Sequence, residues 1–252
     1  MSTSFSLQTG TGLTAYRGRS VIFLIAAAVG LIVLSAGCGE RLVARRVESA
    51  VEARLPELIG PADSYDVHVS GSTAKMLSGH VRRLVMQGDG VRMRGGLRVD
   101  ELTVEMLNVR FDIEKNALQG ADETRFRARV SESALTRFVS ARQPDLKDLR
   151  IELDSGAATV RTRPGLWGVS ANVAMIGRFE LAGANKVDFV FDRMTVAGVS
   201  MPDRVKDYVM ERINPVMALP TSGFRARLES IEIRRRRLLV DGTADLTNGT
   251  GQ

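Results

Sequence analysis

Apolar and polar residues alternate along much of the chain, and this period of two constrains its fold more than any other feature. Residues 65–70 alternate in this way, and residues 79–93 have the pattern of two strands around a turn at 88–90. In the longest run, residues 97–113, the apolar positions change phase twice. Because strand side chains point alternately to opposite faces, each change of phase predicts a bulge or a strong bend. The sequence therefore predicts long, curved, antiparallel strands.

Three other segments have the three- and four-residue spacing of amphipathic helices: residues 42–58, 131–144 and 201–215. Each of the first two is followed by further strand patterns, so a helix and an antiparallel meander occur in the same order twice. This order indicates an α+β fold rather than a parallel α/β sheet. No low-complexity linker interrupts it. We therefore predict a single domain over residues 38–246 and a disordered tail over 247–252.

Residues 1–37 have the order of segments found in export signals. Residues 20–37 carry no charged side chain and follow a polar stretch that contains arginine. The run ends in Leu34-Ser35-Ala36-Gly37-Cys38, which is similar to a bacterial lipobox and holds the only cysteine of the chain. We expect a lipoprotein signal with Cys38 as the lipidated N-terminus or, alternatively, a retained transmembrane anchor. Both place the protein on the outer face of the cell membrane.

The composition limits the chemistry available. One cysteine and two histidines exclude a Cys-based zinc site and leave few groups for acid–base catalysis. An envelope hydrolase or transferase that uses Asp66 and His68 is the least favoured alternative, because the Gly-x-Ser-x-Gly and His-Glu-x-x-His motifs are absent. The net charge of +6 favours an anionic partner. For an exported chain that partner is a membrane surface rather than nucleic acid. We expect no enzymatic activity, no cofactor and no metal.

Several segments that follow the anchor are similar to one known family. They are Arg41 to Glu48, Gly95 to Leu102, Val130 to Leu135, Ile213 to Val216 and Leu238 to Thr243. Together they resemble the LmeA-like family of actinobacterial cell-envelope proteins, which are described as phospholipid-binding and whose mycobacterial member is linked to lipomannan elongation. The resemblance implies a fold similar to the tubular lipid-binding proteins, in which a long curved antiparallel sheet wraps around amphipathic helices and leaves an apolar groove.

Candidate residues for the acyl groove come from the apolar faces of the predicted helices and strands. They are Val47, Val51, Leu55, Leu135, Phe138, Val139, Phe189, Phe191, Val209 and Ile213. A groove and an ordinary core need the same apolar side chains, so both interpretations stand. Arg234 to Arg237 form the densest positive run beside an apolar segment, typical of a site for lipid headgroups, with a solvated hairpin as the alternative.

The function that this sequence favours is that of a membrane-tethered envelope protein. We expect it to bind a phospholipid or a lipid-linked glycan precursor in an apolar groove and to support lipoglycan or envelope biogenesis. Its partners are then a phospholipid or glycolipid and the membrane surface. The alternative is a structural or adaptor domain whose core is fully packed and holds no ligand.

Overall fold

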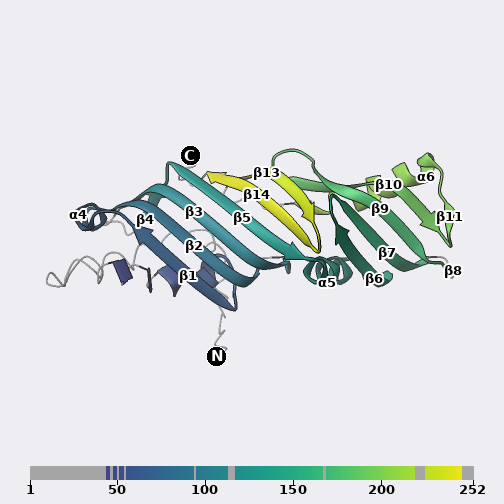
Figure 1. Cartoon of the computed structure of the whole chain (residues 1–252), viewed down its shortest axis with the longest axis horizontal. Helices are drawn as coiled ribbons and strands as arrows, with labels where there is room; N and C mark the ends of the chain where they lie inside the picture. The colour runs from purple at the N-terminus through teal and green to yellow at the C-terminus, as the bar shows by residue number, and fades with distance from the viewer. Residues whose placement is uncertain are drawn as a thin grey trace, which may run out of the picture.

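The computed structural model describes residues 44–45, 48–49, 51–53, 55–93, 95–112, 117–166, 169–218 and 225–245. Most of these residues lie in two antiparallel sheets that are placed end to end, so that the molecule is long and narrow (Figure 1). Helix α5 (Glu132–Arg142) lies where the two sheets meet.

The first sheet has the strand order β1-β2-β3-β5-β14-β13, and β4 pairs with β3 outside this path. Its strands are β1 (Ser64–Ser70), β2 (His80–Arg92), β3 (Arg98–Asp112), β4 (Ala117–Gly120), β5 (Glu123–Ser131), β13 (Arg225–Arg234) and β14 (Arg237–Asp245). The C-terminal hairpin β13–β14 therefore returns to the sheet that the N-terminal strands begin. It forms the edge of that sheet nearest to the second sheet (Figure 1).

The second sheet has the order β11-β10-β9-β7-β6, and β12 and β8 pair with β10 and β7. Its strands are β6 (Leu146–Asp154), β7 (Ala157–Leu166), β8 (Val169–Ser170), β9 (Val173–Leu181), β10 (Lys186–Val196), β11 (Val199–Ser200) and β12 (Met217–Ala218). The other described helices are α3 (Leu55–Leu58), α4 (Thr73–Leu77) and α6 (Asp203–Ile213).

The two sheets are built in the same way. In the first sheet, the side chains of a helix supply hydrogen-bond acceptors to the edge strand. The backbone N–H of Val69 donates to Glu48 Oε1 at 3.0 Å, and that of Val67 donates to Glu52 Oε1 at 3.1 Å. Glu48 and Glu52 are helical residues, and β1 is an edge strand. The two carboxylates therefore satisfy edge N–H groups that another chain would otherwise pair with.

The side chains of helix α5 supply the corresponding hydrogen-bond acceptors to the edge strand of the second sheet. The N–H of Leu153, in edge strand β6, donates to Glu132 Oε1 at 2.7 Å, and the N–H of Ile151 donates to Thr136 Oγ1 at 3.1 Å. Donor and acceptor are 21 and 15 residues apart in both sheets. Each helix then leads into four meandering strands, β1-β2-β3-β5 and β6-β7-β9-β10. The chain thus contains two copies of a helix-and-meander unit, as the repeated order of patterns predicts.

The predicted α+β class, with a sheet wrapped around amphipathic helices, is wrong, because the fold is dominated by antiparallel sheet. Helices α5 and α6 have 11 residues each and so span ~16 Å, whereas the 15 residues of β3 span ~50 Å. The helices lie at the junction and beside the sheets instead of inside them (Figure 1). Helices of this length cannot fill the inside of such sheets.

The local predictions near the helices are confirmed. Ser131 caps α5 by accepting a hydrogen bond from the N–H of Ala134, and α5 ends before Pro144. Helix α6 ends at Ile213, as the Asn-Pro pair after it predicts. The predicted turn at residues 88–90 is wrong, since β2 continues through it. Asp89 pairs with neighbours on both sides, and this ladder overrides the local preference for a turn.

Candidate functional site

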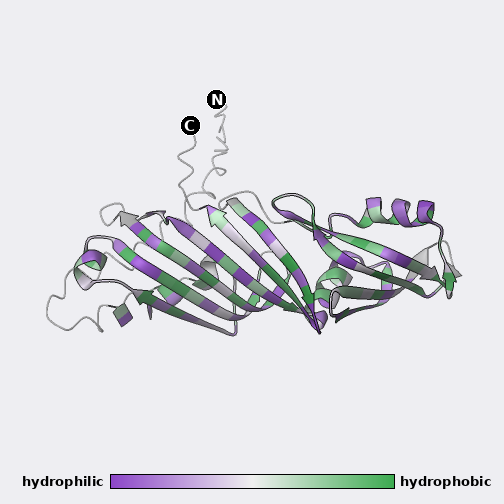
Figure 2. Ribbon diagram, turned by 45° about the horizontal axis from the view of Figure 1, so that its top comes forward, coloured by the Kyte–Doolittle hydropathy of each residue, from purple (hydrophilic) through white to green (hydrophobic). Residues whose placement is uncertain are grey.

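The two faces of the first sheet have different chemistry. Hydrophilic and hydrophobic residues alternate along its strands (Figure 2), and its outer face carries arginines that pair with carboxylates across or along the strands. These pairs are Arg83 with Glu105, Arg125 with Glu123, Arg127 with Asp241, and Arg129 with Glu101. All are partly exposed, so each pair adds little stability. Because these charges balance one another, this part of the outer face offers little net charge to an anion.

The inner face of the first sheet is apolar and only partly covered. Many of its apolar residues are buried: Leu84, Met86, Leu102, Val130, Leu238 and Val240. Over the centre of the sheet, the following apolar residues are only half-buried: Val104, Met106, Phe126, Ala128 and Ile231. We call these five residues the open face. They are neighbours, because Val104 pairs with Phe126, and Ala128 and Ile231 both pair with Val240.

Two details shape the open face. A Cβ at Gly242 would lie 2.5 Å from Phe126 Cζ, so the Phe126 ring lies across strand β14 where only glycine leaves room. Beside Met106, the side chain of Thr124 is buried, and among the described residues its Oγ1 is the one buried side-chain polar atom without a partner. The surface is therefore apolar, with a broad aromatic ring near the C-terminal hairpin.

The corresponding face of the second sheet is closed. Phe189 and Phe191 are 2% and 3% exposed. The Phe189 ring lies 5.2 Å from that of Phe179 and 5.9 Å from that of Phe191. Asn214 also holds the backbone of Phe189, accepting from its N–H at 2.9 Å and donating to its carbonyl at 3.2 Å. This face is a packed core around Phe189 and Phe191, and Phe179, which pairs with Phe189, is half-buried beside it.

The predicted groove residues fall mainly in such cores. Buried are Val51, Leu55, Leu135, Phe138, Phe189 and Phe191, and half-buried are Val139, Val209 and Ile213. Val47 and Cys38 lie outside the described residues. The structure does not bring these side chains together around one pocket, and their contact with a lipid stays a prediction. The open face includes none of them.

A seam separates the two sheets and contains a pocket. The hairpin β13–β14 is joined to the second sheet at its two ends. Leu228 N–H donates to the Ala184 carbonyl at 2.7 Å, Gly156 N–H donates to the Ile233 carbonyl at 3.0 Å, and Arg236 N–H donates to the Leu153 carbonyl at 2.8 Å. Between these points a pocket of about 730 Å³ opens. Its lining is Ser155, Gly156, Arg178, Phe179, Ile231 to Arg235, and Arg237.

The predicted arginine run forms the tip of this hairpin. Arg234 pairs with Arg237 in the ladder, and Arg235 and Arg236 make the turn, with Arg236 at a φ of 64°. Arg234 contacts Glu232 at 3.1 Å, and Arg236 contacts Glu132 at 3.4 Å. Glu232 raises the pKa of Arg234, which keeps it charged. Sequence reasoning missed Arg178, because only the topology brings β9 to this hairpin.

His68 and Asp66, on which the catalytic alternative depends, lie at the surface of β1. His68 Nε2 lies 3.5 Å from Asp66 Oδ2, and both side chains are largely exposed. Among the described residues, no group of three or more His, Cys, Asp and Glu side chains is arranged to hold a metal ion. The described helices also include none that is long and apolar enough to cross a bilayer. Residues 20–37 lie outside the described part of the chain.

A half-open apolar face that leads to an arginine-lined pocket suits an amphiphilic ligand. In agreement with this geometry, a family model described as LmeA-like phospholipid-binding matches residues 38–243. The chain belongs to the LmeA-like phospholipid-binding family, as the resemblance in its sequence predicts. No curated protein and no solved structure matched the chain.

Proposed function

We propose that this protein is tethered to the membrane of a bacterial cell envelope and binds the acyl chains of a phospholipid, or of a lipid-linked glycan precursor, on the open face. In this role it supports lipoglycan or envelope biogenesis. The observation that carries the proposal is the incomplete cover over Val104, Met106 and Phe126 in a chain of a phospholipid-binding family.

The energetics of acyl transfer favour this surface over isolated exposed residues. Each CH₂ group that leaves water contributes ~0.8 kcal/mol, so a protein competes with a bilayer only through a long continuous apolar contact. The open face consists of residues of β3 and β5 and of Ile231 in β13, and a bound chain would cross the buried Val240 of β14 between Ala128 and Ile231. With strands ~4.8 Å apart, this contact crosses ~14 Å of sheet.

Membrane tethering rests on the N-terminal segment and is tested separately. The expected result is that wild-type protein incorporates labelled fatty acid and has an intact mass that begins at Cys38, whereas Cys38→Ser does neither. Unlabelled wild-type protein that retains residues 1–37 would instead indicate a plain transmembrane anchor.

Lipid binding is tested with a matched pair of variants in the full-length protein. Val104 and Val85 are both half-buried valines on adjacent strands, but Val104 faces the open face and Val85 faces the outer face, where it pairs with Glu105. Lipids extracted from purified protein are counted by mass spectrometry per folded molecule. We expect Val104→Ser to lower this count and Val85→Ser to leave it unchanged. Equal counts in both variants, or no lipid in wild type, would favour the adaptor alternative.

A further inference from the structure

The arginines around the seam pocket are not equivalent. Arg234 is paired with Glu232, and Arg178 is held on the other side by Glu180 at 2.5 Å and Asp192 at 3.1 Å. Arg235 and Arg237 are exposed and form no ion pair with any described residue. The pocket lining thus contains four arginines and one carboxylate, and that carboxylate is already neutralised. The excess positive charge belongs to Arg235 and Arg237.

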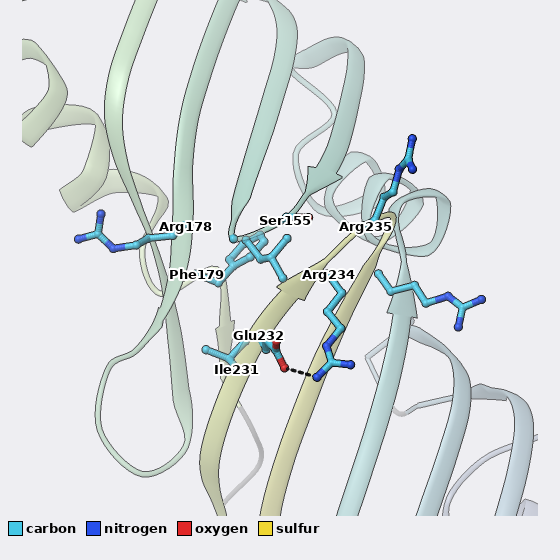
Figure 3. Close-up of a pocket in the computed structure, with 10 residues that line it drawn as sticks. Ser155, Arg178, Phe179, Ile231, Glu232, Arg234 and Arg235 are labelled. Atoms are coloured by element: carbon cyan, nitrogen blue, oxygen red, sulfur yellow. Dashed lines mark hydrogen bonds and ion pairs between the residues drawn. The ribbon is translucent and has the colours of Figure 1, made fainter.

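The floor of the pocket is apolar and connects to both sheets. Figure 3 shows Phe179 and Ile231 between Arg178 on one side and Arg234 and Arg235 on the other. Phe179 contacts the Phe189 ring of the second sheet, and Ile231 belongs to the open face of the first. Ile231 therefore belongs to both the pocket lining and the open face, so a ligand in the pocket reaches the edge of the open face.

The backbone of β13 adds a donor at the same place. The carbonyl of Ile233 points outward, because it accepts from Gly156 of the second sheet. Ile231 has the same phase in the strand, so its N–H also points out of the ladder and toward the seam. This N–H forms no hydrogen bond with another described residue.

We propose that the seam pocket binds the phosphate-bearing end of one amphiphile, with Arg235 and Arg237 holding the phosphate and Phe179 and Ile231 contacting the start of the apolar chain. This inference rests on the proposed function and assigns the headgroup to a place in the fold. Guanidinium groups bind phosphate through charge-assisted, often bidentate hydrogen bonds. Arg235 points away from Phe179 and Ile231 (Figure 3), so in this arrangement the phosphate lies at the mouth of the pocket and the apolar chain follows the floor. Arg234 and Arg236 hold the hairpin in place instead of binding the ligand.

The test uses full-length protein in nonionic detergent and three soluble probes: dihexanoyl phosphatidic acid, dihexanoylglycerol and inorganic phosphate. Binding is measured by titration calorimetry to wild type, to Arg235→Ser/Arg237→Ser, and to the control Arg193→Ser/Arg204→Ser. The control removes the same charge from exposed arginines in β10 and α6, outside the pocket lining, that form no ion pair with a described residue. Circular dichroism checks that all three proteins are folded.

We expect wild type and the control to bind the phosphatidic acid about tenfold or more tightly than the diacylglycerol, and the seam variant to lose this preference. Unchanged preference in the seam variant, while wild type still binds both lipids, would overturn the seam site and leave the proposed function standing. Displacement of the phosphatidic acid by an equal concentration of inorganic phosphate would also overturn it, because the site would then hold free phosphate. Failure of wild type to bind either lipid would contradict the proposed function itself.

Discussion

The two sheets share one arrangement of a helix and a meander, but their apolar faces are packed to different extents. Both begin with a helix whose side chains accept from the edge strand, and both continue into a four-stranded meander. In the second sheet, Phe189 and Phe191 close the apolar face, whereas in the first sheet Val104 and Phe126 remain half-exposed. The same architecture therefore forms one half whose apolar face is largely packed and one half whose apolar face is partly open.

The largest expected loss of stability comes from removing a buried aromatic ring in the second sheet. Phe189→Ser removes a ring that contacts two others and leaves a cavity where the backbone is also held by Asn214. We expect the free energy of unfolding to fall by ~3–5 kcal/mol, and most of the domain to unfold. Denaturant titration followed by circular dichroism measures this. A loss below ~1 kcal/mol would mean that the second sheet, too, tolerates empty space.

The two helix-to-edge contacts are expected to differ in strength. Glu52 presents a charged acceptor to Val67, and Thr136 presents a neutral hydroxyl to Ile151. Hydrogen bonds to charged groups contribute ~1.5–3 kcal/mol, against ~0.5–1.5 kcal/mol for neutral ones. Glu52→Ala should therefore destabilise more than Thr136→Ala. Amide hydrogen exchange should rise at Val67 in the first variant and at Ile151 in the second. Unchanged exchange at these amides would show that the side chains do not protect the edges.

On the open face, the effect on stability is expected to be smaller than in the closed half. Phe126 is half-buried, so Phe126→Ser removes fewer contacts than Phe189→Ser and should cost clearly less than the ~3–5 kcal/mol of a buried ring. Its effect should appear instead as less lipid bound per folded molecule, measured by mass spectrometry of organic extracts. If Phe126→Ser unfolds the protein as Phe189→Ser does, then the first sheet is closed in solution and the contrast between the sheets is lost.

The sequence predicts the local elements well where a capping residue or a regular alternation marks a helix or a strand. Ser131 marks the start of α5, and the alternation of residues 97–113 marks the long strand β3. Strands β5 and β7 are missed, since β5 alternates arginines with few large apolar residues and resembles a solvated segment. In the folded sheet those arginines find carboxylates on neighbouring strands, as Arg129 does with Glu101. Such long-range pairs are not visible in local periodicity.

The fold class and the candidate site need information that the pattern of residues lacks. Apolar spacing predicts that Phe189 and Val104 both face inward, but only the packed structure shows that one is buried and the other half-open. The alternation of Thr124, Phe126, Ala128 and Val130 with arginines could have indicated the inner face of β5. Nothing in the sequence places Arg178 and Arg235 around one pocket, because the return of the last hairpin to the seam creates that arrangement.

The most direct test of the account is to locate the lipid on the protein. Full-length protein is loaded with a phospholipid that carries a photoreactive diazirine in one acyl chain, irradiated, digested and mapped by mass spectrometry. The account predicts crosslinks in the peptides of β3, β5 and β13 that carry Val104, Met106, Phe126, Ala128 and Ile231. Crosslinks confined to the second sheet around Phe189, or to the outer arginine face of the first sheet, would contradict it.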